Sequence, residues 1–243
     1  MLGIEGHHLF LGLVALLAEV FGTVSGFGSS TIFVPIASFF ENFRLVLMLT
    51  SFLHLISNFS KIFLFWGSTP SRRALMMSIP SILLTGLGAM ISSWVPQRSA
   101  EIFLGVLLMI LAPFLLWSRY RKWEIPPLVF HLLLAISGFL TGLVGTGGAI
   151  RGFALASGGL SKNEFVLLSS IIDSGGDLFR AGVYLQKGYM DWSQWIFIPL
   201  LILAGLLGSK LGQLALKRVK QRNFEILVAL MIFISGFLLL LNK

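Results

Sequence analysis

The chain has 243 residues, of which 56% are hydrophobic and only 12% are charged. A soluble domain carries about a quarter charged residues, so this composition excludes an ordinary soluble protein and predicts an all-α polytopic membrane protein. The formal net charge of +8 could suggest nucleic-acid binding in a soluble chain. Basic loops also orient membrane proteins, so we expect no nucleic-acid partner.

Apolar runs separated by short polar links make up the first half of the chain. A helix that crosses a bilayer needs about 20 apolar residues, and most of the runs reach or approach that length. Glycines between Ser25 and Ser29 separate the first run from a shorter one. We expect helices over residues 9–25, 29–40, 45–66, 74–94 and 99–118.

A basic stretch that ends in two prolines, residues 119–127, is the strongest linker signal. After it the pattern starts again, with a run that ends in glycines and a short run beyond them. We expect helices over residues 128–144, 147–156, 165–185, 192–216 and 224–241. The predicted domains are a membrane repeat over 1–118, a cytoplasmic linker over 119–127 and a second membrane repeat over 128–243.

The two halves match at a single offset of 119 residues. At that offset Gly26 and Gly28 fall on Gly145 and Gly147. A stripe of polar residues falls on a second stripe in the same way. Thr50, His54, Asn58 and Lys61 correspond in order to Ser169, Asp173, Asp177 and Arg180. Polar residues are scarce in this chain, so the shared stripe indicates two copies of one unit.

The positive charges predict how the copies are oriented. Clusters of Lys and Arg at 72–73, 119–122 and 217–222 should be cytoplasmic, because basic loops are retained on that side. The copies are then inverted, provided that each glycine break turns the chain back into a hairpin. We expect both termini outside the cell membrane. Inverted repeats with broken helices near the bilayer midplane are typical of transporters.

Each polar stripe lies on one helical face, because its members are spaced i, i+4, i+8 and i+11. One interpretation is a packed polar seam between helices, with Asp177 and Arg180 paired at i,i+3. The other is a transport path, because ionisable residues at membrane depth mark such paths. We favour the path, with Asn58, Lys61, Asp177 and Arg180 as substrate-binding candidates.

The glycine breaks predict an anion site. A short helix starts after each break, and the unpaired N–H groups and dipole of a helix N-terminus attract anions. The fork of Arg151 suits an oxyanion, although this side chain could instead snorkel or pair with Glu19 or Asp173. The binding candidates at the breaks are Gly28, Ser29, Ser30, Thr31, Gly147, Gly148, Ala149 and Arg151.

Three ionisable residues within the apolar runs, Glu19, His54 and Asp173, are candidates for coupling transport to an ion. Glu19 could instead lie near the interface and stay hydrated, and His54 could be a hydrogen-bonded structural residue. The pair His7-His8 has no nearby Cys or His to complete a metal site. We therefore predict no metal and no cofactor, and a small anion as the partner, with a possible coupling ion.

Two stretches resemble the glycine-rich motifs of the TauE/SafE sulfite-exporter family. They are residues 26–35 (GFGSSTIFVP) and 145–154 (GTGGAIRGFA). The chain departs from the family pattern at Ser29-Ser30, where glycines are usual, at Ala154, where a proline is usual, and at Arg151, where the position is usually apolar. The resemblance implies transport of small sulfur-containing or carboxylated anions across the plasma membrane.

The predicted function is secondary transport of a small anion, either sulfite, a sulfonate or a thiosulfate-like species, by alternating access. The anion is expected between the two hairpin tips. The alternatives are an anion channel and a permease for small carboxylates. A membrane-embedded enzyme is disfavoured, because the sequence has no His-Glu-x-x-His pair and no obvious set of nucleophile and base.

Overall fold

The computed structural model describes residues 6–25, 28–67, 79–118, 125–157 and 162–216, with single residues or short pieces at 76, 160 and 226–241. Its described elements are all helical. They are α1 (Gly6–Ser25), α2 (Ser30–Ala37), α3 (Phe43–Leu64), α5 (Ile79–Ile91), α6 (Gln97–Ser118), α7 (Pro127–Val144), α8 (Gly148–Ser157), α9 (Lys162–Gln186), the 3-10 helix η1 (Trp192–Ile196) and α10 (Phe197–Leu216).

The two predicted helix breaks are present, and each contains a glycine in the left-handed region. Gly28 has a φ of +87°, and Gly145, which caps the C-terminus of α7, has a φ of +82°. Residues with a Cβ rarely adopt this conformation, so glycine lets the chain turn between α1 and α2 and between α7 and α8. Gly26 lies outside the described residues.

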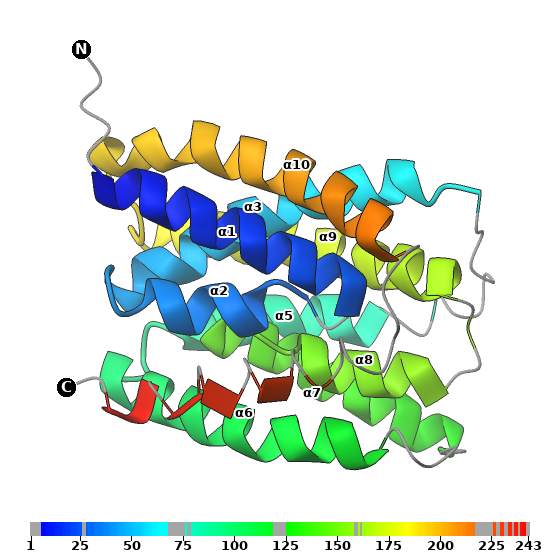
Figure 1. The fold of residues 1–243 in the computed structure, drawn as a ribbon. Helices are drawn as coiled ribbons and strands as arrows, with labels where there is room; N and C mark the ends of the chain where they lie inside the picture. The colour runs from blue at the N-terminus through cyan, green and yellow to red at the C-terminus, as the bar shows by residue number, and fades with distance from the viewer. Residues whose placement is uncertain are drawn as a thin grey trace.

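The helices lie side by side along one common direction, as Figure 1 shows. Helix α1 packs along α10, α5 packs along α7, and α3 and α9 pack on each other in the interior. The beginning of α1 and the last described residues lie at the same end of the bundle, where the link between α9 and α10 also lies (Figure 1). The basic clusters at 72–73, 119–122 and 217–222 lie outside the described residues.

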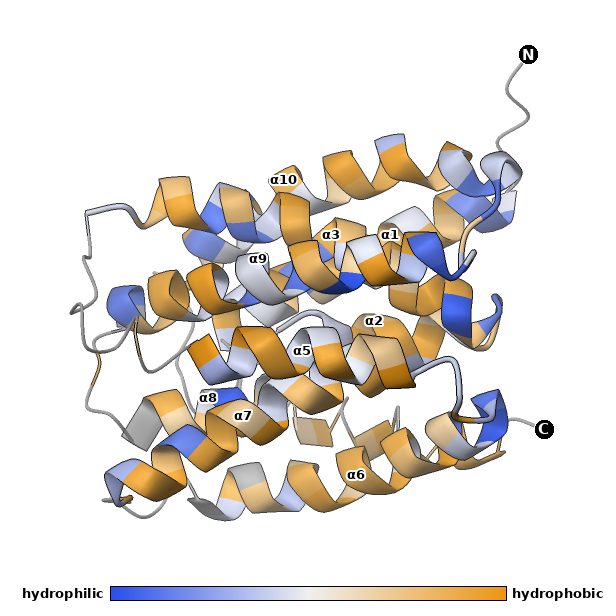
Figure 2. Ribbon diagram, turned by 180° about the vertical axis from the view of Figure 1, so that it is seen from behind, coloured by the Kyte–Doolittle hydropathy of each residue, from blue (hydrophilic) through white to orange (hydrophobic). Residues whose placement is uncertain are grey.

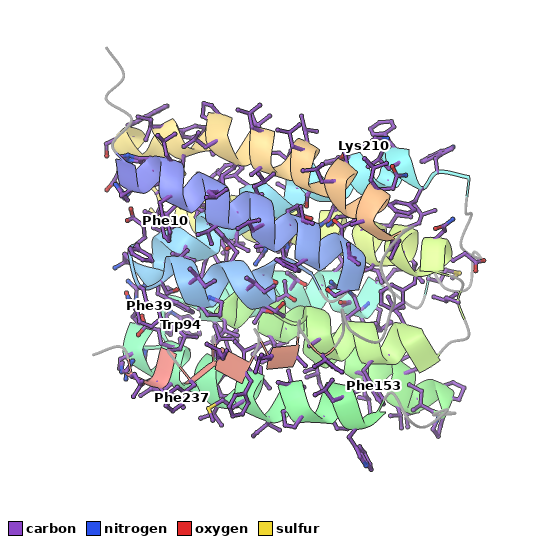
Figure 3. All side chains as sticks on the ribbon, viewed as in Figure 1. Phe10, Phe39, Trp94, Phe153, Lys210 and Phe237 are labelled. Atoms are coloured by element: carbon purple, nitrogen blue, oxygen red, sulfur yellow. The ribbon has the colours of Figure 1, made fainter. Side chains whose placement is uncertain are left out.

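Hydrophobic residues, coloured orange, predominate along the outer helices of the bundle in the ribbon of Figure 2. Side chains such as Phe10, Trp94 and Phe237 project outward (Figure 3) and are 42%, 79% and 47% exposed. Among the described residues, five helices are long and apolar enough to cross a membrane, and α5 is a shorter apolar helix. The fold is that of a multi-pass membrane protein.

Glycines let α5 and α7 approach backbone to backbone. A Cβ added to Gly138 would collide with the carbonyl oxygen of Ser81, and one added to Gly142 would collide with that of Thr85. Gly88 makes the reciprocal contact with the carbonyl oxygen of Phe139. Small residues commonly mediate close packing between membrane helices. These contacts fix α7, and with it the second helix break, against α5.

Candidate functional site

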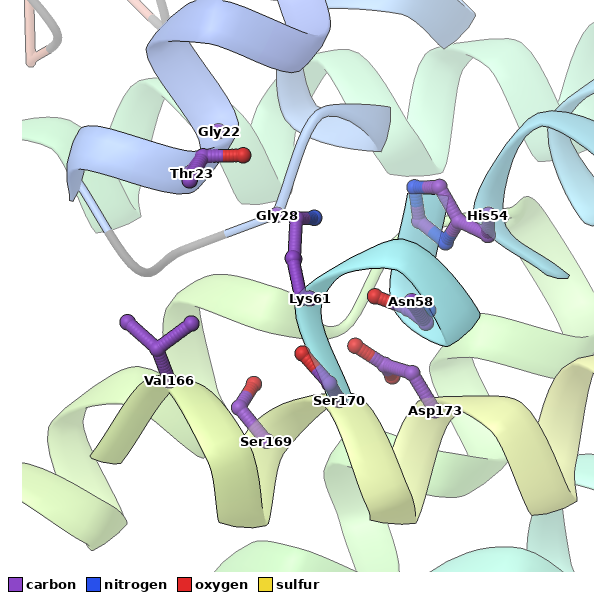
Figure 4. A pocket seen from close by; sticks show the side chains of 10 residues that line it. All are labelled: Gly22, Thr23, Gly28, His54, Asn58, Lys61, Val166, Ser169, Ser170 and Asp173. Atoms are coloured by element: carbon purple, nitrogen blue, oxygen red, sulfur yellow. The ribbon is translucent and has the colours of Figure 1, made fainter. Parts of the chain in front are cut away.

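A cavity of about 20 Å³ lies between α1, the break at Gly28, α3 and α9, with room for about one water molecule. Polar side chains from α3 and α9 converge on it (Figure 4). Its lining residues are Gly22, Thr23, Gly28, His54, Asn58, Lys61, Val166, Ser169, Ser170 and Asp173. The two predicted polar stripes therefore face one another across this cavity.

Beside the cavity, α1 and α3 are joined by a buried ion pair. The Nζ atom of Lys61 lies 2.5 Å from Oε1 of Glu19, whose side chain is fully buried. Ser29, in the first helix break, donates its hydroxyl to Oε2 of Glu19 at 2.7 Å, and Thr23 donates to Oε1 at 3.4 Å. Glu19 thus holds Lys61 and the first break together.

A second buried ion pair joins α8 to α9. The guanidinium of Arg151 contacts both carboxylate oxygens of Asp173, and its Nη2 atom lies 2.6 Å from Oδ2. The Nε–H of Arg151 donates to the hydroxyl of Ser169 at 3.1 Å. This fork-to-carboxylate arrangement is the strong form of a charged hydrogen bond. The sequence left Arg151 with two possible carboxylate partners, and Asp173 is the one it binds.

A third charged group lies behind the cavity, centred on Asp177 and Arg180 of α9. Arg180 Nε lies 2.8 Å from Oδ1 of Asp177, although its N–H is not aligned for a hydrogen bond. Asn58 donates to Oδ2 of Asp177 at 3.2 Å, and Nδ1 of His54 lies 3.5 Å from the same oxygen. Arg180 also donates to the carbonyl oxygen of Thr141 at 3.1 Å.

Charges in this region balance in the side chains that the structure describes. Three carboxylates and three cations are buried there, and with a neutral His54 the sum is zero. They are Glu19, Asp173 and Asp177, and Lys61, Arg151 and Arg180. Buried ion pairs are weak contributors to stability, because desolvation offsets their attraction. Such a concentration at membrane depth is instead typical of a transport path.

The two helix breaks meet, as the sequence predicts. Ser30, at the start of α2, donates to the hydroxyl of Thr146 in the second break at 3.3 Å. A Cβ placed on Gly28 would lie 3.9 Å from Nη2 of Arg151. Residues separated by more than a hundred positions are thereby brought to one point near the cavity.

Several predicted binding residues have other roles in the structure. The hydroxyl of Thr31 donates to the carbonyl oxygen of Gly28 at 2.9 Å, while Ser29 is committed to Glu19. Gly147 packs against Ser137, whose carbonyl oxygen would collide with an added Cβ. Gly148 and Ala149 open α8 and are absent from the cavity lining described above.

Glu19 is fully buried, so the interpretation of it as a hydrated interfacial residue is wrong. Sequence reasoning missed Thr23 and Ser170, which both line the cavity. Thr23 lies four residues after Glu19, and that helical spacing was the available signal. Among the described residues, no group of three or more His, Asp or Glu side chains could hold a metal ion.

Comparison with known proteins identifies the family of the chain. No curated protein matches the chain. The model of the family described as "Sulfite exporter TauE/SafE" matches residues 11–239, nearly the whole chain. The protein therefore belongs to the TauE/SafE family of membrane transporters, as its two glycine stretches predicted.

Proposed function

We propose that the protein is a secondary transporter of a small organosulfur anion in the plasma membrane, working by alternating access between two inverted repeats. The observation that carries the proposal is the meeting of both helix breaks beside a cavity, close to two buried cations, Lys61 and Arg151, that are each paired with a carboxylate. Ammonium and guanidinium groups have more N–H donors than one carboxylate accepts, so an incoming anion can bind these cations beside the carboxylates.

Several contacts support the inverted repeats. Asn58 of α3 and Asp177 of α9 correspond at the offset of 119 residues, and they are hydrogen-bonded to each other. A residue contacts its own equivalent only close to an axis that relates the two copies. The packing of α1 on α10 has its counterpart in the packing of α7 on α5. We take residues 1–118 and 128–243 as the two units.

The anion would lie between the hairpin tips, with the guanidinium of Arg151 and the ammonium of Lys61 as its charged partners. The N–H groups at the start of α2 and α8 would add neutral donors. The cavity holds about one water molecule, so a sulfonate requires α3 and α9 to separate from the hairpins. In this mechanism the structure described above is an occluded state, between one state open to the outside and one open to the cytoplasm.

The proposed topology places both termini outside and the 119–127 linker in the cytoplasm. The chain has no cysteine, so single cysteines can be labelled without background. A cysteine at Asp191, in the exposed link between α9 and η1, should react with an impermeant reagent added outside. Cysteines in 119–122 and 217–222 should be protected from it, and labelling of these two clusters from opposite sides would refute the inverted repeats.

Counterflow in proteoliposomes tests the transport function. Vesicles preloaded with unlabelled isethionate, a permanently charged sulfonate, should accumulate radiolabelled isethionate transiently. A channel dissipates the gradient without this overshoot. A panel of sulfite, thiosulfate and acetate identifies the preferred headgroup, and failure of all four anions to exchange would overturn the proposal.

Arg151→Lys keeps the charge but loses the two-pronged contact. We expect it to weaken isethionate binding by about tenfold, corresponding to the loss of one charged hydrogen bond. Arg98→Lys is the matched control, because Arg98 lies on α6 and donates to the carbonyl oxygens of Leu239 and Leu240. Equal affinity in both variants would remove Arg151 from the site.

A further inference from the structure

His54 is the cavity-lining residue whose hydrogen bonding is incomplete. Its side chain is 5% exposed, and its Nε2 atom is buried without a hydrogen-bond partner among the described residues. Figure 4 shows the ring with one nitrogen turned toward Asn58 and the other toward the space beside Lys61. A buried polar atom without a partner is costly, and here it borders the space proposed for the anion.

Charged groups surround His54 from α9, α8 and α1. On α9, Asp177 Oδ2 lies 3.5 Å and Arg180 Nη2 lies 3.4 Å from Nδ1 of the ring. Asp173 of the same helix lines the cavity with His54. The remaining charges are the pair Glu19–Lys61 and the guanidinium of Arg151. Helix α2 contains no charged residue, and Lys210 of α10 is exposed and donates to Gln213.

These charges sum to zero while His54 is neutral, so an anion that enters alone leaves an uncompensated buried charge. Burying such a charge is unfavourable. One proton bound to the imidazole restores the balance. In the imidazolium both ring nitrogens are donors: Nδ1 faces Asp177, and Nε2 faces the space beside Lys61. The charged ring therefore complements an anion at this position.

The neighbouring carboxylates are poorer candidates for this proton. Glu19 already accepts from Lys61, Ser29 and Thr23. Asp173 is held by both terminal nitrogens of Arg151. Protonating either carboxylate would weaken its ion pair and leave a buried cation less compensated. Protonating His54 breaks no contact at Nε2. It exchanges one contact at Nδ1, which stops accepting from Nη2 of Arg180 and donates to Oδ2 of Asp177 instead.

We propose that His54 binds the proton that accompanies the anion, so that transport is a one-to-one symport of H⁺ with a monovalent oxyanion. The proton enters the imidazole from water on the side where the cavity is open. It leaves on the other side with the anion, and no other covalent bond changes. This proposal rests on the proposed transport function. Symport of one proton with one sulfonate moves no net charge.

Isethionate is the suitable probe, because a sulfonate stays ionised at neutral pH and cannot itself carry the proton. Proteoliposomes with a pH-sensitive dye inside report proton flux, while radiolabelled isethionate reports anion flux in the same sample. For the wild-type protein we expect one proton per isethionate and no effect of an imposed membrane potential on the initial rate. Isethionate flux without proton flux, or a rate that follows the potential, would overturn the coupling and leave the transport function intact.

The matched variants are His54→Gln and His131→Gln. His131 lies near the start of α7, and its ring contacts the carbonyl oxygen of Pro127 at 2.5 Å. We expect His54→Gln to lower the proton-to-anion ratio at least tenfold and to make the remaining flux sensitive to potential, with His131→Gln unchanged. An unchanged ratio in His54→Gln overturns the proposal. If His54→Gln does not fold, the potential dependence of the wild type decides. No isethionate flux in the wild type overturns the transport of sulfonates and the coupling together.

Discussion

The two helix breaks are held in place by different kinds of interaction. The break at Gly28 is attached through side-chain charge: Ser29 donates to Glu19, and Glu19 is paired with Lys61 of α3. The second break is attached on its α7 side through backbone carbonyls, while the ion pair of Arg151 with Asp173 attaches its α8 side. Arg180 and Tyr184 of α9 donate to the carbonyl oxygens of residues 141 and 142.

The difference follows from which residues occupy equivalent positions in the two halves of the chain. At the offset of 119, Lys61 corresponds to Arg180, but Glu19 corresponds to Gly138. In the second half, α7 therefore has no carboxylate at this position that could pair with Arg180 of α9. Gly138 stands there instead and lets α7 pack closely against α5. A carbonyl attachment does not depend on protonation or on an anion, whereas an ion pair does. We infer that α1 and α2 respond to the substrate and that α7 is the scaffold, while α8, held by the ion pair of Arg151 with Asp173, responds with them.

The largest effect is expected from Glu19→Gln. This change leaves Lys61 buried without its carboxylate, which should cost about 3–5 kcal/mol of stability. Glu101→Gln is the matched control, because its partner Arg98 has a side chain that is 42% exposed and its loss should cost less than about 1 kcal/mol. Thermal unfolding of the purified protein in detergent measures both.

Adding Lys61→Met to Glu19→Gln sharpens the result. Removal of both charges should recover much of the lost stability, because the cost arises from the unpaired cation. A double variant that is as unstable as Glu19→Gln alone would show that the pair is not what attaches the first hairpin.

A smaller effect on stability is expected from Gly142→Ala, which crowds the close contact between α5 and α7. An added Cβ would collide with the carbonyl oxygen of Thr85 and lie 2.6 Å from the backbone nitrogen of Ala89, so α5 and α7 must move apart at a cost of about 1–3 kcal/mol. Gly182→Ala, where nothing lies within 4 Å of the added atom, should instead stabilise the protein by about 0.5–1 kcal/mol. Similar melting temperatures for the two variants would argue against backbone packing as the scaffold.

The smallest effect on stability is expected from Tyr184→Phe and Ser29→Ala, each of which removes one hydrogen bond worth about 1 kcal/mol. Their effects on transport should separate them. Tyr184→Phe loosens only the scaffold and should transport isethionate at close to the normal rate. Ser29→Ala disconnects the first break from Glu19 and should change the rate severalfold. Equal transport rates would contradict the division of roles.

The sequence predicted that each polar stripe lies on one helical face and that the breaks meet, because both follow from helical spacing and a duplicated unit. It could not predict which charges pair. Lys61 reaches Glu19 rather than Asp173 because of how α1 and α3 are rotated and shifted against each other, and no local pattern encodes that register. For the same reason the hydroxyl of Ser29, predicted as a substrate ligand, was not recognised as a donor to Glu19.

A structure with a bound heavy anion tests the central claim most directly. Selenite has the shape and charge of sulfite, and its selenium can be located by anomalous scattering. We predict a single strong peak between the two breaks, within hydrogen-bonding reach of Arg151 or Lys61. A peak farther than about 8 Å, roughly one Debye length at physiological salt, from both Gly28 and Gly147 would contradict a binding site at the hairpin tips.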